Sequence, residues 1–164
     1  MPKDLSKMHP KLYELYIPFK TEADLVGLPF IVTCVERTIL EQMALFVQGR
    51  LDVSNVNLFR TSAGLSLIKP AENRKVTWTL NSYHVVNYFD KDLNNDYSRA
   101  FDVALLKFGR PHWDIKISVN ENEIPDYEEL GLLGKKHGLV WGGGFRNPDR
   151  PHFQLPERLL KGGD

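Results

Sequence analysis

The spacing of apolar residues changes along the chain, and each change predicts a different element. Within residues 11–26, Leu12, Leu15 and Phe19 recur at helical spacing, so this segment is predicted to be a helix. Pro18 lies inside the pattern, and a proline removes a backbone hydrogen bond and crowds the preceding turn. We therefore expect the helix to be broken at this residue.

Several segments have the character of strands. Residues 30–35 and 100–106 are short apolar runs, which are typical of buried strands. Residues 76–80 alternate between apolar and polar side chains, as a half-buried strand does. Residues 139–141 and 152–155 flank a glycine-rich stretch, which predicts two strands joined by a turn.

Start and stop signals mark the ends of two further predicted helices. Thr38 and Glu41 have the spacing of a capping box, and Gly49 is a stop signal after the apolar positions that follow. Residues 125–137 begin with a proline and are followed by a glycine, and this arrangement predicts a second helix. Residues 51–75 are polar and weakly patterned, so they are predicted to form a loop.

The predicted helices and strands alternate irregularly, unlike the strict repeat of a parallel α/β fold. The predicted fold class is therefore α+β, with helices packed on a small antiparallel sheet. A chain of 164 residues can bury one core, so we expect a single domain over residues 1–164. Its N-terminal helical segment covers about residues 1–28, and its catalytic core covers about residues 29–158.

The charge balance narrows the classes of partner. The chain has 21 basic and 21 acidic residues, so its net charge is zero. No excess of positive charge therefore indicates that the protein binds nucleic acid. No apolar run approaches the roughly 20 residues of a membrane span. The N-terminus lacks the apolar core of a signal peptide. We expect a monomer that is made in the cytoplasm and is not inserted into a membrane.

The single cysteine, Cys34, lies in the apolar run at residues 30–35. No intrachain disulfide can form, so the cysteine content does not mark an oxidising compartment. A cysteine in such a run is expected to be a small buried hydrophobe rather than a nucleophile.

Candidate chemistry centres on Asp149 and His152. An acid three residues before a histidine, beside a glycine turn, suits a metal-bound imidazole next to a carboxylate that handles protons. A catalytic zinc site needs three protein ligands and one open position, and His84 and Asp102 can supply the other two ligands. The remaining histidines are expected to be solvated or structural: His9, His112 and His137.

These residues lie in motifs that resemble a family of zinc peptidases, which includes the L-alanyl-D-glutamate endopeptidases of phage lysins and D-alanyl-D-alanine carboxypeptidases. The family's second motif is an acid-x-x-His after a Trp-Gly turn, and residues 138–143 followed by residues 149–153 resemble it. The first motif, Ser-x-His-x-x-Gly-x-Ala-x-Asp, is similar to residues 82–84 taken together with residues 100–102. Residues 36–50 are similar to the family's Arg-Thr-x-x-x-Gln helix segment.

The first motif is contiguous in the family, whereas residues 85–99 interrupt it here and are predicted to be an inserted loop. Asp90 is an alternative ligand, because it follows His84 closely. Asp102 is preferred because it keeps the family's strand, and a rigid strand holds a ligand better than a polar turn does. The resemblance covers about residues 30–155.

The inserted segment contains an acidic turn whose oxygen donors alternate like the start of a calcium-binding loop. The turn lacks the glycine and the glutamate that complete such a loop, so a solvated surface turn is the other interpretation. A calcium ion is therefore a second cofactor hypothesis, with the ligands Asp90, Asp92, Asn94 and Asp96.

The resemblance implies one zinc ion held by His84, Asp102 and His152, with water as its fourth ligand. Zinc brings the pKa of such a water to roughly 7, so hydroxide is available at neutral pH. Asp149 would take the proton of this water and pass it to the leaving amine.

The resemblance further implies roles for three residues at the substrate. Arg37 would bind a substrate carboxylate or carbonyl through its paired donors. Gln42 would hydrogen-bond the substrate backbone or support the site. Ser82 would bond a metal ligand or the turn around it.

The implied substrate is the stem peptide of bacterial peptidoglycan. The second motif is closer to that of the L-alanyl-D-glutamate endopeptidases, which are endolysin-like, than to that of the carboxypeptidases. The alternatives are a D-alanyl-D-alanine carboxypeptidase or dipeptidase, and a non-catalytic wall-binding or phage tail module on the same fold. An enzyme made without a signal would act on the cell wall after release through a holin-type membrane hole.

Overall fold

A computed structural model describes residues 3–86 and 96–160 of the chain. Its contacts divide the chain into two compact units. Unit 1 combines Met1–Glu36 with Tyr97–Asp164, and unit 2 is the continuous segment Arg37–Asp96. The N-terminal helix therefore folds in the same unit as the C-terminal strands.

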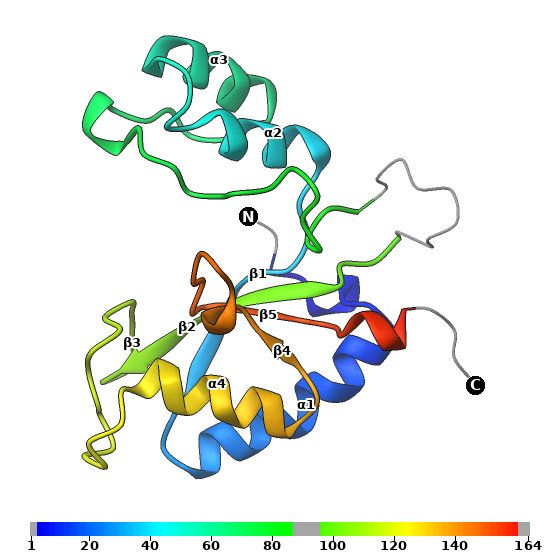
Figure 1. Cartoon of the computed structure of the whole chain (residues 1–164), viewed down its shortest axis with the longest axis vertical. Helices are drawn as coiled ribbons and strands as arrows, with labels where there is room; N and C mark the ends of the chain where they lie inside the picture. The colour runs from blue at the N-terminus through cyan, green and yellow to red at the C-terminus, as the bar shows by residue number, and fades with distance from the viewer. Residues whose placement is uncertain (1–2, 87–95, 161–164) are drawn as a thin grey trace. The chain divides into compact units, whose positions relative to one another are not determined.

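Unit 1 contains a five-stranded antiparallel sheet (Figure 1). The order along the sheet is β1-β2-β5-β4, and β3 pairs with β2. This sheet with its helices confirms the predicted α+β class. β3 was not expected from the sequence, whereas the other four strands were. The strands are β1 (Phe30–Cys34), β2 (Ala100–Lys107), β3 (Arg110–His112), β4 (Val140–Trp141) and β5 (His152–Gln154).

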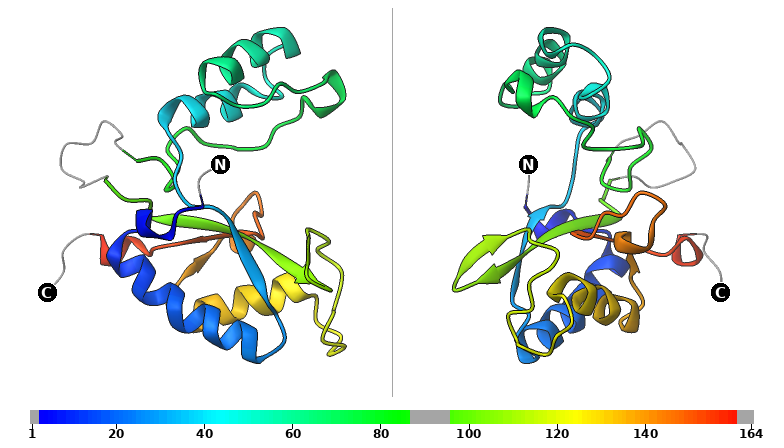
Figure 2. Two further views of the ribbon diagram at one scale, coloured as in Figure 1. Left: turned by 180° about the vertical axis from the view of Figure 1, so that it is seen from behind. Right: turned by 60° about the vertical axis from the view of Figure 1, so that its left-hand side comes forward.

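Helices α1 (Pro10–Leu25) and α4 (Asp126–Lys136) cover one face of this sheet (Figure 1 and Figure 2). Three fully buried rings join the helices to the strands. The ring of Phe19 lies 4.9 Å from that of Phe153, which in turn stacks on Phe101 at 5.7 Å between centroids. Aromatic rings bury large apolar areas, so this cluster fixes α1 on β2 and β5.

The same strands carry polar side chains on their other face. Successive side chains of a strand point to opposite faces of the sheet. Since Phe101 and Phe153 point toward the helices, their neighbours Asp102 and His152 point away from them. The alternation of β2 and β5 thus separates a packed apolar face from a polar face.

Helix α1 runs without interruption through Pro18, so the predicted break is wrong. Pro18 lies on the exposed side of the helix. The carbonyl that loses its hydrogen bond can therefore be solvated. The buried side chains on either side of the proline, among them Leu12, Tyr16, Phe19 and Ala23, hold both halves on one core. Tertiary packing outweighs the local cost of the proline.

Unit 2 contains α2 (Ile39–Val47) and α3 (Val53–Ser62). The capping box predicted for α2 is present, with Thr38 and Glu41 bonding each other's backbone. The prediction of a loop over residues 51–75 is wrong because α3 lies within it. The side chain of Asp52 caps α3 by accepting a hydrogen bond from the Asn55 amide at 3.1 Å, which is a start signal for a helix.

Residues 76–80 form no strand and pair with none among the described residues, so the predicted strand is also wrong. Side chains of α2 and of the turn that follows it hydrogen-bond to this backbone instead. Gln42 donates to the Thr79 carbonyl at 2.7 Å, and Arg50 donates to the Thr77 carbonyl at 3.1 Å. Trp78, between the two threonines, is exposed.

The remaining helical segments are short 3-10 turns. No helix within residues 3–86 and 96–160 is long and apolar enough to cross a membrane. The 3-10 turns are Leu5–Lys7, Pro70–Glu72, Gly142–Gly144 and Glu157–Leu159.

The Trp141 ring joins α4 to the glycine turn that follows β4. A Cβ atom on Gly131 would lie 2.3 Å from this ring, and one on Gly143 would lie 2.1 Å from it. The indole Nε1 of Trp141 donates to the Arg150 carbonyl at 2.8 Å. Two glycines thus make room for a ring that positions the chain just before β5.

The substitution Gly131→Ala tests this packing. At an interior position of a helix, replacing glycine by alanine normally stabilises the folded protein by about 1 kcal/mol. Here the added methyl would meet the Trp141 ring, and overpacking costs about 1–3 kcal/mol. Chemical denaturation should therefore show a net loss of stability. The control Leu132→Ala changes a side chain that is 60% exposed on the same helix and should have a small effect. A Gly131→Ala protein as stable as the parent would contradict this account.

Candidate metal centre

Three residues on neighbouring strands lie in one row across the sheet. Cys34 of β1 pairs with Asp102 of β2, and Asp102 pairs with His152 of β5. Directly opposed residues on adjacent strands present their side chains on the same face, with Cβ atoms about 5 Å apart. The register therefore brings a thiol, a carboxylate and an imidazole together on the polar face of the sheet.

The imidazole of His152 is buried and has an oxygen partner at each nitrogen. Its Nδ1 lies 3.1 Å from Oδ1 of Asp102, and its Nε2 lies 2.9 Å from Oε1 of Gln154. An imidazole that donates from both nitrogens carries two protons. Oxygen partners at both nitrogens therefore favour the doubly protonated, charged ring.

Charge and hydrogen bonding determine the pKa of His152. Burial has the largest single effect and lowers this pKa, because it disfavours the charged ring. The hydrogen bond and charge of Asp102, the Gln154 hydrogen bond and the charge of Asp149 together outweigh burial. The pKa of His152 therefore lies above its ordinary value.

This pair fits a divalent metal ion. When Nδ1 of His152 loses its proton, a lone pair faces the carboxylate of Asp102, and a cation between them removes the repulsion. Gln154 keeps the other nitrogen protonated, which fixes the tautomer that offers Nδ1 as a ligand. Nitrogen and carboxylate donors together suit zinc.

Asp149 lies at the exposed edge of this buried pair. Ligand atoms of Asp102, Asp149 and His152 lie within 4.8 Å of one another. The Asp149 amide donates to the Gly142 carbonyl at 2.9 Å, and its carbonyl accepts from the His152 amide at 3.2 Å. A Cβ atom on Gly142 would lie 2.4 Å from the Asp149 carbonyl oxygen. The glycine turn thus allows the close approach that positions this acid.

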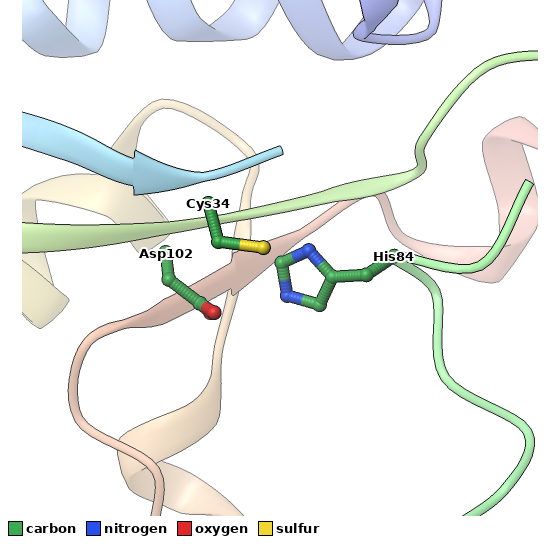
Figure 3. A group of neighbouring side chains, drawn as sticks. All are labelled: Cys34, His84 and Asp102. Carbon is green, nitrogen blue, oxygen red and sulfur yellow. The ribbon is translucent and has the colours of Figure 1, made fainter. Parts of the chain in front are cut away.

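His84 is a candidate ligand in unit 2, whereas Cys34 and Asp102 lie in unit 1. The ligand atoms of Cys34 and Asp102 lie within 4.8 Å of each other. Figure 3 draws all three side chains, with the thiol of Cys34 beside the carboxylate of Asp102. The His84 amide donates to Oγ of Ser82 at 3.3 Å, and the His84 carbonyl accepts from the Arg37 amide at 2.8 Å. Ser82 therefore supports the turn that carries His84.

Arg37 and Gln42 are joined by their side chains. Nη1 of Arg37 donates to Oε1 of Gln42 at 3.2 Å. Gln42 is fully buried, and its Nε2 donates to the Thr77 hydroxyl at 3.2 Å as well as to the Thr79 carbonyl. The amide of Gln42 thus connects the guanidinium to residues 76–80.

Part of the inserted acidic turn lies outside the described residues. This applies to Asp90, Asp92 and Asn94, whereas Asp96 is described and is exposed. The calcium hypothesis and the alternative ligand Asp90 both stay predictions.

Two residues of this centre were missed in the sequence. Cys34 gave only the signal of a buried strand residue, because its place opposite Asp102 depends on strand register. Gln154 could have been noted, since it lies two residues after His152 and the side chains at i and i+2 of a strand share a face.

The segment that carries this acid–histidine arrangement is similar to a known peptidase family. Residues 94–155 match a family model described as D-alanyl-D-alanine carboxypeptidase. The matched segment contains Asp102, Asp149 and His152, and the match confirms the resemblance to this peptidase family that is seen in the sequence.

Two relatives extend the comparison over most of the chain. The peptidoglycan L-alanyl-D-glutamate endopeptidase CwlK of Bacillus subtilis (strain 168) is 26% identical over 152 residues, which are 92% of this chain and 74% of that protein. The crystal structure of the Serratia marcescens L-Ala D-Glu endopeptidase ChiX has a TM-score of 0.54 and 20% identity. The match covers 94% of this chain and 84% of that chain, and it shows a shared fold.

The pKa of His152 gives a prediction for the metal-free protein. A raised pKa means that the folded state holds the proton more tightly than the unfolded state does. The resulting stabilisation is fully present below about pH 6.5 and is lost as the pH rises through the folded pKa. NMR titration of the chelator-treated protein should show His152 titrating above its ordinary range, and Asp102→Asn should lower that pKa. A His152 that titrates below pH 6.5 in the parent would contradict this assignment.

Proposed function

We propose that the protein is a zinc-dependent peptidase of bacterial peptidoglycan and that it acts as an L-alanyl-D-glutamate endopeptidase. One observation carries the proposal. A carboxylate–imidazole pair, the partly buried Asp102 and the buried His152, has the exposed acid Asp149 beside it. This is the arrangement that a hydrolytic metal centre needs, with ligands held in the fold and a base open to substrate. The relatives CwlK and ChiX, both named as L-alanyl-D-glutamate endopeptidases, support the choice of bond.

In this proposal His84, Asp102 and His152 hold one zinc ion. When bound, zinc acidifies a water ligand and polarises the scissile carbonyl. Within unit 1, Asp102 lies close to both His152 and Asp149, which supports its role at the centre of the site. Gln154 holds the His152 ring in the tautomer that binds metal.

Asp149 is the general base and then the general acid. Its carboxylate takes a proton from the attacking water and delivers it to the leaving amine. Its exposure leaves it accessible to both groups, and the hydrogen bond to Gly142 holds its backbone in place. A positioned acid–base group of this kind contributes about 10² to 10⁴ in rate.

Arg37 binds a carboxylate or carbonyl of the stem peptide, because its planar guanidinium makes paired hydrogen bonds to such oxygens. Gln42 is fully buried and accepts a hydrogen bond from Arg37, which favours support of the guanidinium over direct contact with substrate. Ser82 supports the turn of His84 through its hydroxyl.

Two other functions are each favoured by a specific observation. The description of the matching family model favours a D-alanyl-D-alanine carboxypeptidase. The segment inserted between His84 and Asp102 favours a non-catalytic wall-binding module, since an insertion in a ligand motif is tolerated when catalysis is not needed.

Mass spectrometry of digested muropeptides separates these functions. Zinc-loaded protein should cut the stem after its first L-alanine, so the glycan keeps that residue and the remaining peptide is released. The matched variant Asp149→Asn should keep its zinc and its fold, while its rate falls by about 10² to 10⁴ because the base is lost.

Other outcomes are equally clear. Loss of a terminal D-alanine would establish the carboxypeptidase. Intact muropeptides would contradict both peptidase activities, and a protein that also binds no zinc would favour the wall-binding module. Cleavage by Asp149→Asn at the parent rate would show that Asp149 is not the base.

A further inference from the structure

A β-bulge determines which residue of β1 faces Asp102. Val32 pairs with Val103, so regular antiparallel register would place Thr33 opposite Asp102. The register shifts between Val32 and Cys34, and Cys34 takes that place. Bulges leave one residue unpaired and redirect the side chains that follow. The thiol therefore lies in the row of Asp102 and His152 because of a specific irregularity in the strand.

The surroundings of Cys34 are those of a metal donor. The residue is 1% exposed, and its sulfur lies within 4.8 Å of a carboxylate oxygen of Asp102, which in turn contacts the His152 ring at 3.1 Å. Two donors bound to one tetrahedral zinc at the usual bond lengths lie roughly 3.6 Å apart, so small side-chain shifts suffice to share an ion. The sulfur also approaches the Glu36 carbonyl at 3.9 Å, a weak contact that the thiol would give up with its proton.

We propose that Cys34 is a sulfur donor to the metal ion that Asp102 binds, and that it competes with water for the open position. This inference rests on the metal site of the proposed function. The ion displaces the thiol proton to solvent, and the thiolate binds in its place. The centre then has a closed form with four protein donors and an open form with a water ligand. A thiolate also makes the site favour zinc, cobalt and cadmium over harder ions.

Cobalt(II) absorption tests this inference without relying on activity. A thiolate bound to cobalt produces a charge-transfer band in the near ultraviolet, whereas nitrogen and oxygen donors produce only the weaker visible bands. Metal-free full-length protein titrated with cobalt should develop both kinds of band. The near-ultraviolet band should be lost in Cys34→Ser and Cys34→Ala. The matched control Thr33→Ala, which changes the residue displaced by the bulge, should retain it.

Each outcome decides the question. Visible bands without a charge-transfer band in the parent would overturn the role of Cys34 and leave the metal site intact. A charge-transfer band that survives in Cys34→Ala would also overturn it. Absence of any cobalt absorption would contradict the proposed metal site and the inference together. Circular dichroism of both cysteine variants identifies a loss of fold. If only one of the two variants folds, its cobalt spectrum is compared with that of the parent.

Discussion

The contact between Asp102 and His152 across β2 and β5 is the interaction on which the rest of the site depends. It places a carboxylate and an imidazole in a partly buried environment, where a cation between them removes the repulsion of two lone pairs that face each other. In the metal-free protein that cation is a proton, and in the proposed enzyme it is zinc. The pKa of His152 and the proposed affinity for metal therefore have the same physical origin.

The sheet makes this contact possible by separating two kinds of side chain. Phe101 and Phe153 anchor the strands on α1 and α4, and their neighbours are the polar pair. The glycines around Trp141 let the turn before β5 approach closely, which sets Asp149 at the edge of the pair. The same strands thus carry the core on one face and the site on the other, so a change in core packing is expected to disturb the geometry of the site.

The sequence predicted the parts of this protein that local patterns encode. The apolar runs of β1 and β2, the capping box of α2 and the acid-x-x-His motif are all signals of neighbouring residues. The uninterrupted helix at Pro18 and the unpaired segment at residues 76–80 could not be predicted, because tertiary contacts outweigh local preference at both. The place of Cys34 opposite Asp102 depends on a bulge, and strand register is not readable from one strand alone.

The most direct test of the proposed centre is the zinc content of four single variants, measured by elemental analysis of folded protein. His84→Ala, Asp102→Ala and His152→Ala should each bind far less zinc than the parent, which should hold about one ion per chain. Asp90→Ala, the alternative ligand in the inserted segment, should bind as much zinc as the parent. Full zinc content in Asp102→Ala would contradict the account, since the ion would then be bound without the carboxylate that the account assigns as its ligand.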